Sequence, residues 1–157
     1  MMSAAHSPPA TDMLKVAREL RARSAREWFA KGDDTGERIA VLIHLRVSDE
    51  ENSGLTLPPR DAADPTFRIW VAAPDMPTLE RILSHEMTHV VLSVRFEGRL
   101  PVWADEGVAS QEDDPARLRL RREIVRHWQQ SNAVPSLDDL VMRRSIVASD
   151  RETYAAA

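Results

Sequence analysis

The hydrophobic positions of this chain follow two different spacings. Short stretches rich in branched and aromatic residues are typical of strands, and they lie at residues 38–47, 55–57 and 67–73. Longer stretches with apolar residues three or four positions apart are typical of helices that bury one face, and they lie at residues 13–31, 78–96 and 116–130. We therefore predict an α+β fold in which a small antiparallel or mixed sheet is followed by a mostly helical C-terminal part.

The predicted helix at residues 78–96 contains an H-E-x-x-H sequence that runs from His85 to His89. Residues four apart lie on the same face of a helix, so these two imidazoles can bind one ion. Glu86 lies too far round the helix to bind the same ion, but it can reach a water molecule on the metal and accept its proton. The pattern therefore predicts a zinc site with its own general base.

A catalytic zinc site usually has three protein ligands in addition to water. The chain contains no Cys, and Arg95 occupies the place where the metzincins have a further His ligand. Downstream, Trp103 to Ala109 reads W-A-D-E-G-V-A, in a predicted short helix at residues 103–113. This segment resembles the W-x-x-E-G-x-A segment of gluzincin metallopeptidases, the group that includes thermolysin-like proteases and the zinc aminopeptidases.

The resemblance extends from about Phe67 to Ala109, with a weaker match near Tyr154. Sixteen residues separate His89 from Glu106, and in this respect the chain is similar to compact peptidase-MA-like domains and minigluzincins. In gluzincins the third zinc ligand is a Glu from a second helix, which corresponds to Glu106 here. The resemblance thus implies a zincin-like fold with Zn²⁺ bound by His85, His89 and Glu106.

The resemblance also implies an activity, the hydrolysis of peptide bonds through a metal-bound water that Glu86 activates. The substrate would be a peptide or protein held by an edge strand beside the active-site helix, for which residues 67–73 are the candidate. A plain strand covered by another element is the alternative. Tyr154 corresponds to the residue that stabilises the oxyanion, and His127 is the alternative donor.

The chain departs from the gluzincin pattern in two respects, and each limits which roles of gluzincin residues can be assigned to this sequence. Ser110 stands where thermolysin-like enzymes have an Asp that orients a ligand imidazole, which leaves open three carboxylates: Asp105, Glu112 and Asp113. The sequence also stops at Ala157, where similar domains continue through a further helix. We therefore expect either a minimal domain or a chain truncated at its C-terminus.

Length, composition and charge restrict the remaining possibilities. A chain of 157 residues with 43% hydrophobic and 29% charged residues fits one soluble domain, expected at residues 13–157 after a disordered segment at 1–12. The net charge of −4 provides no basic field for nucleic acid. No run is long enough to span a membrane, and residues 1–12 lack the apolar core of a signal peptide.

The absence of Cys leaves the redox compartment undecided. The protein is cytoplasmic by default, or exported after removal of a signal, and its oligomeric state stays open. Two alternatives to an active peptidase also stay open. One is a zinc-binding but latent or inactive domain that acts as an interaction module, with the helix at 13–31 or the C-terminal tail in its cleft. The other is a structural protein that binds no metal.

Overall fold

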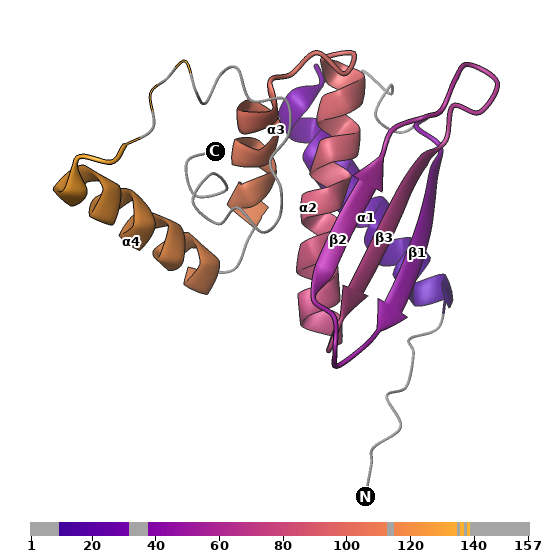
Figure 1. The fold of residues 1–157 in the computed structure, drawn as a ribbon. Coiled ribbons are helices and arrows are strands. Elements are labelled where there is room, and N and C mark those ends of the chain that lie inside the picture. The colour runs from indigo at the N-terminus through magenta and orange to yellow at the C-terminus, as the bar shows by residue number, and fades with distance from the viewer. Residues whose placement is uncertain (1–9, 32–37, 113–114, 135, 137, 139–157) are drawn as a thin grey trace, which may run out of the picture. The chain divides into compact units, whose positions relative to one another are not determined.

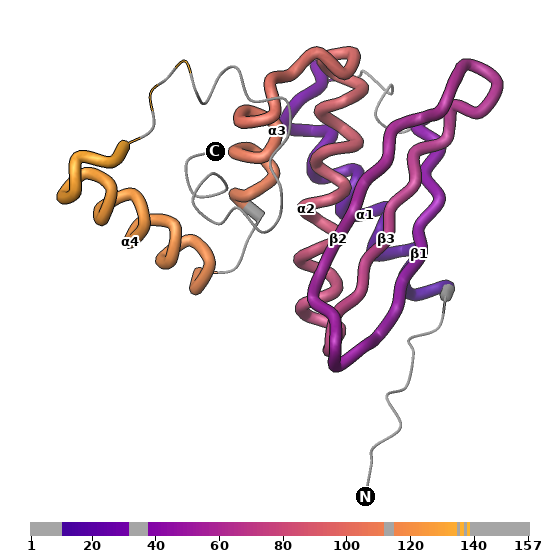
Figure 2. The backbone as a smooth tube through the Cα atoms, viewed as in Figure 1, coloured from indigo at the N-terminus to yellow at the C-terminus, as the bar shows by residue number. Residues whose placement is uncertain are grey.

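The computed structural model describes residues 10–31, 38–112, 115–134, 136 and 138. These residues form an α+β structure with a mixed three-stranded sheet, and the path of the chain can be followed in Figures 1 and 2. The elements in chain order are α1 (Ala10–Trp28), β1 (Val41–Val47), β2 (Ser53–Leu57), β3 (Phe67–Ala73), α2 (Met76–Arg95), α3 (Val102–Ala109), the 3-10 helix η2 (Ser110–Glu112) and α4 (Pro115–Ser131). The chain divides into two compact units, Met1–Gly98 and Arg99–Ala157.

The sheet of the first unit has the strand order β1-β3-β2, with β1 parallel and β2 antiparallel to β3. Residues 67–73, which are β3, are therefore the central strand, and the prediction that they form the sheet edge is wrong. Both sides of β3 are hydrogen-bonded to neighbours, so it has no free backbone groups along its length to offer to a peptide. Of the two edge strands among the described residues, β2 is in closer contact with α2 than β1 is.

The register of the sheet decides which residues of β2 face the helices. Gly54 pairs with Val71 and Thr56 pairs with Ile69. Residues that lie directly opposite each other have their side chains on the same face. Because Ile69 and Val71 are buried in the core, Gly54 and Thr56 also face α2, while Leu55 between them lies on the exposed face.

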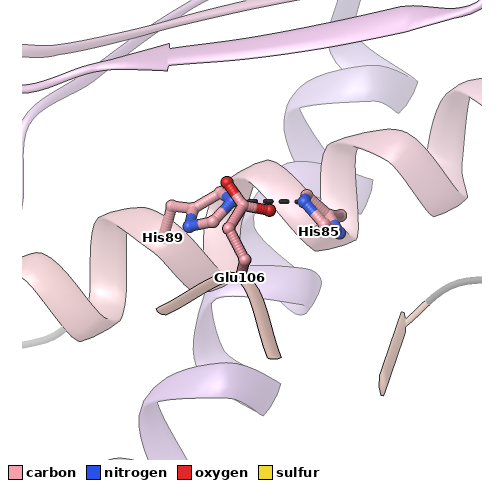
Figure 3. Close-up of side chains that lie close together, drawn as sticks. All are labelled: His85, His89 and Glu106. Atoms are coloured by element: carbon pink, nitrogen blue, oxygen red, sulfur yellow. Dashed lines mark hydrogen bonds between the residues drawn. The ribbon is translucent and has the colours of Figure 1, made fainter. Parts of the chain in front are cut away.

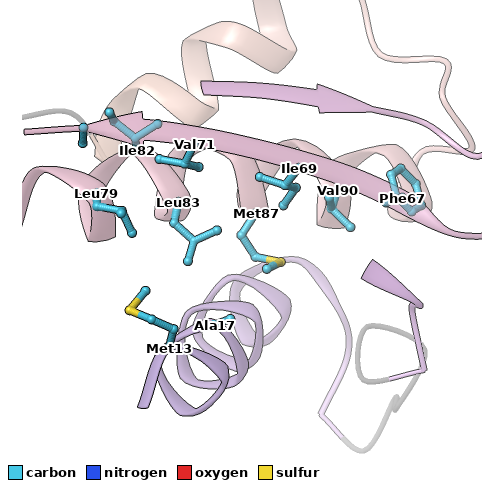
Figure 4. Close-up of a cluster of buried hydrophobic side chains, with 11 residues drawn as sticks. Met13, Ala17, Phe67, Ile69, Val71, Leu79, Ile82, Leu83, Met87 and Val90 are labelled. Atoms are coloured by element: carbon cyan, nitrogen blue, oxygen red, sulfur yellow. The ribbon is translucent and has the colours of Figure 1, made fainter. Parts of the chain in front are cut away.

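The core of the first unit lies between the sheet and the helices α1 and α2 (Figure 4). It is built from apolar side chains of all three elements: Met13, Ala17, Phe67, Ile69, Val71, Ala73, Leu79, Ile82, Leu83, Met87 and Val90. Helix α2 packs against both β3 and β2, and α1 packs against α2. Burying each large aliphatic side chain stabilises the fold by about 1.5–3 kcal/mol. Because α2 contributes several such side chains to the core, its position against the sheet and α1 is strongly fixed.

Defined caps fix both ends of α2. The carboxylate of Asp75 accepts a hydrogen bond of 2.8 Å from the backbone N–H of Thr78, which satisfies one of the free donors of the first turn. At the other end Gly98, at φ +66°, donates from its N–H to the carbonyl of Ser93 at 2.8 Å. The helix predicted at residues 78–96 therefore begins two residues earlier, at Met76, and ends at Arg95.

The remaining helices differ from their predicted bounds in small ways. Helix α1 begins at Ala10 and ends at Trp28, so the last residues of the segment expected to be disordered are helical. In the second unit, the helix expected at 103–113 divides into α3 and the 3-10 turn η2. Helix α4 buries a single residue, Trp128. Within the described ranges, no helix combines the length and the apolar character that crossing a bilayer requires.

Candidate metal centre

Two imidazoles of α2 lie together on one face of the helix. The Nε2 atoms of His85 and His89 are 3.1 Å apart, and the two rings are nearly perpendicular, at 76°. His85 is buried, with 7% of its surface exposed, and His89 is half-buried. This is the arrangement that the spacing of the two residues predicts, because one helical turn places them side by side.

Glu106 of α3 completes a group of three side chains that could hold a metal ion. The candidate ligand atoms of His85, His89 and Glu106 all lie within 4.8 Å of one another (Figure 3). Among the described residues this is the only group of at least three His, Asp or Glu side chains that meets this condition.

Glu86, the predicted general base, belongs to α2 but not to this group. It is buried, with 7% of its surface exposed. The hydroxyl of Thr56 lies 2.7 Å from Glu86 Oε2 and 3.1 Å from the backbone oxygen of the same residue. A hydroxyl has one proton to donate, and the shorter contact is the one to the carboxylate. A buried carboxylate needs such donors because burial without hydrogen bonds is costly.

Besides Thr56, a second residue of β2 lies close to Glu86, namely Gly54. An added Cβ at position 54 would lie 2.8 Å from Glu86 Cδ, closer still to Oε1, and 2.6 Å from Ile82 Cγ2. Sequence reasoning missed both Gly54 and Thr56. The available signal was the glycine inside a short strand, which often marks a position where another group approaches the backbone closely.

Hydrogen bonds also hold the turn of α2 that contains His85. A guanidinium N–H of Arg23 in α1 donates to the hydroxyl of Ser84 at 2.6 Å. The hydroxyl of Thr88 donates to the backbone oxygen of Ser84 at 3.1 Å. Both Ser84 and Thr88 are buried, so α2 is tied to α1 one residue before the first candidate ligand.

The other predicted residues have different outcomes. Ser110 donates from its hydroxyl to the backbone oxygen of Glu106 at 2.5 Å, which is a cap of α3 and not a contact with an imidazole. His127 is exposed on α4. Tyr154 and Asp113 lie outside the described residues, as does the side chain of Glu112, so their roles remain predictions.

His44 is exposed on β1. Its ring stacks on Trp70 of β3, with centroids 5.0 Å apart and an interplanar angle of 6°. The two residues are direct partners in the register, so the stack is a cross-strand contact on the face of the sheet that points away from the helices.

Comparison with known proteins adds no evidence about the site. No protein-family model, curated protein or solved structure matches the chain.

Proposed function

We propose that this protein is a zinc-dependent metallopeptidase of the gluzincin type. The observation that carries the proposal is the grouping of His85, His89 and Glu106, with Glu86 next to the first histidine on the same helix. Two imidazoles and a carboxylate, from an H-E-x-x-H helix and a later Glu-Gly segment, are the ligand set of that class. The same three residues leave a fourth position for water or substrate, as a catalytic site requires.

The chemistry of the donors supports zinc as the metal. Imidazole nitrogen and carboxylate oxygen are common zinc ligands, and the chain has no thiolate to favour a softer ion. Two ligands held about 2.0–2.1 Å from a tetrahedral zinc ion lie roughly 3.3 Å apart. The 3.1 Å between the Nε2 atoms of His85 and His89 fits this value. The donors present therefore suit the ion.

In the proposed reaction the protein's own groups position the reactants and move a proton. A bound zinc ion would polarise the scissile carbonyl and make water a better nucleophile. Glu86 accepts the proton of the attacking water and delivers it to the leaving amine. Tyr154 is the proposed hydrogen-bond donor to the oxyanion. Each of these roles is carried over from the resemblance to the gluzincins.

The proposed substrate is an extended peptide or protein segment. Strand β2 is at the edge of the sheet and packs against α2, and its partner β3 occupies only one of its sides. An edge strand offers backbone N–H and C=O groups to which a peptide can add as a further strand. This proposal moves the substrate-binding edge from residues 67–73 to residues 53–57.

The test is metal analysis of the purified protein together with digestion of a peptide library. We expect one zinc ion per chain, and hydrolysis that stops when a chelator removes the metal. Glu86→Gln should retain the zinc and lower hydrolysis by on the order of 10²–10⁴-fold, because an amide cannot accept the proton. If Glu86→Gln hydrolyses peptides as fast as the wild type, the proposed role of Glu86 is wrong.

Glu106→Ala serves as the matched variant for metal binding. It should lower the zinc content after dialysis sharply, whereas Glu86→Gln should not. Unchanged zinc content in Glu106→Ala would exclude Glu106 as a ligand. A wild-type protein that binds zinc but cleaves no library peptide would favour the latent or inactive interaction module, and one that binds no metal would overturn the proposal altogether.

A further inference from the structure

We propose that strand β2 positions the carboxylate of Glu86 through two residues, Thr56 and Gly54. This inference rests on the proposed function, since it assigns positioning residues to the general base of that reaction. Both residues and Glu86 belong to the first unit. Thr56 supplies a hydrogen bond to the carboxylate, and Gly54 supplies the space into which the carboxylate fits.

The contact of Thr56 is directed at the functional end of the side chain. Its Oγ1 lies 2.7 Å from Glu86 Oε2, which is the separation of a strong hydrogen bond between a hydroxyl and a carboxylate. The side chain of Glu has three rotatable bonds, and a proton acceptor works best when held close to one orientation. A hydrogen bond from a strand in the sheet restricts these rotations.

Gly54 acts by the absence of a side chain. A Cβ at this position would approach Glu86 Cδ to 2.8 Å, and real Cβ atoms essentially never come within 3.0 Å of another heavy atom. The backbone of Gly54 is not in the left-handed region, so space rather than conformation requires the glycine. Ile82 and Glu86 would have to move away from β2 to admit even an alanine.

The register explains why both residues reach the same side chain. Gly54 and Thr56 are two residues apart on one strand, so both face α2, while Leu55 between them faces away. The two residues lie nearest different oxygens of the carboxylate, Thr56 at Oε2 and Gly54 at Oε1. Any substrate that pairs with β2 would therefore lie next to the residues that orient the base.

The experiment compares Thr56→Val, which removes the hydroxyl and keeps the shape, with Thr56→Ser, which keeps the hydroxyl. We expect kcat to fall on the order of tenfold to a hundredfold in Thr56→Val, as for the loss of a hydrogen bond to a charged group. KM and zinc content should stay unchanged, and Thr56→Ser should recover most of kcat. Ser48→Ala, which removes a hydroxyl from the turn between β1 and β2, outside the proposed substrate-binding edge, is the control and should leave kcat unchanged.

Gly54→Ala is the second variant, and it should lower kcat at least as much as Thr56→Val while zinc remains bound. If Gly54→Ala fails to fold, Thr56→Val still decides the matter because valine is well tolerated in strands. Unchanged kcat in Thr56→Val, or a loss that Thr56→Ser does not recover, would overturn the proposal.

A double-mutant cycle on the metal-free protein separates this inference from the proposed function. Thr56→Val, Glu86→Ala and the double variant are compared by denaturant unfolding, and contacting residues should shift the unfolding constant non-additively, by at least about threefold. Additive effects would overturn the positioning contact whether or not the protein is a peptidase. A wild-type protein that shows this coupling yet cleaves no peptide would refute the peptidase activity and leave the positioning of Glu86 in place.

Discussion

The candidate ligands come from two helices that are built very differently. Helix α2 has 20 residues, a side-chain cap at Asp75 and buried residues on several faces. Helix α3 has 8 residues, no side-chain hydrogen bond at its N-cap Pro101, and one buried residue, Ala109. The first helix delivers His85, Glu86 and His89, and the second delivers Glu106.

Because α2 is packed far more extensively than α3, the candidate ligands are not held equally well. Packing in the core fixes the backbone of α2, which carries the two imidazoles side by side, so the protein loses little freedom when they bind metal. A short helix with little burial is only marginally stable by itself. We therefore expect the histidine pair to be preorganised and Glu106 to gain much of its order from the metal.

The largest expected effect comes from removing the packing of α2. Leu83 is fully buried, so Leu83→Ala should lower the free energy of unfolding by about 2–5 kcal/mol through lost burial and the cavity left behind. Leu120→Ala on α4 is the control, because Leu120 is 48% exposed and its loss should cost within about 0.5 kcal/mol. Urea unfolding measures the change in the free energy of unfolding for both variants. Equal changes would contradict the expected difference between the buried and the exposed leucine.

A second prediction concerns the response of each helix to zinc. In the metal-free protein, backbone amides of α3 should exchange with solvent faster than the central amides of α2, since α3 can open without disrupting the core. Saturating zinc should slow exchange in α3 on the order of ten- to a hundredfold, and slow it less in α2, because a ligand stabilises the states that bind it. Hydrogen exchange followed by NMR measures this ratio. Equal slowing in the two helices would show that α3 is already as ordered as α2.

The smallest effect is expected at the cap of α2. The hydrogen bond from the Thr78 backbone N–H holds the pKa of Asp75 below its usual value of 3.8. A carboxylate with a lowered pKa stabilises the fold above its ordinary pKa, and this contribution is lost as the pH falls through the lowered value. Asp75→Ala should therefore lower the melting temperature by a few degrees at neutral pH.

The pH dependence supplies the check on this last prediction. The difference in melting temperature between wild type and Asp75→Ala should shrink as the pH is lowered past 3.8. Thermal unfolding followed by circular dichroism over a pH series measures the difference. A gap that stays constant down to acidic pH would mean that the charge of Asp75 does not contribute to capping α2.

Local patterns were sufficient to predict the elements that carry the site. Alternation of Phe67, Ile69 and Val71 predicts β3 with both of its ends, because the period of a strand is visible within a few residues. The distance between His85 and His89 follows from helical geometry in the same way. The α+β class with a small mixed sheet is confirmed for the same reason.

Long-range pairing was not predictable from the same patterns. Alternation shows which face of a strand is buried, but it does not show which strands lie on its two sides, and so the edge was assigned to the wrong strand. The contact of Thr56 with Glu86 joins residues 30 positions apart. Apart from Gly54, two residues earlier, nothing in the sequence around Thr56 distinguishes it from an ordinary surface residue.

The tight fit at Gly54 has a consequence for reading other sequences. A chain with an intact H-E-x-x-H motif but a bulkier residue at the position of Gly54 would have no room for the base in its present rotamer. If Glu86 acts as proposed, such a chain is expected to bind its metal ion without cleaving peptides. Position 54, thirty-one residues before His85, is therefore the place to inspect when a chain with this motif binds metal and shows no hydrolysis.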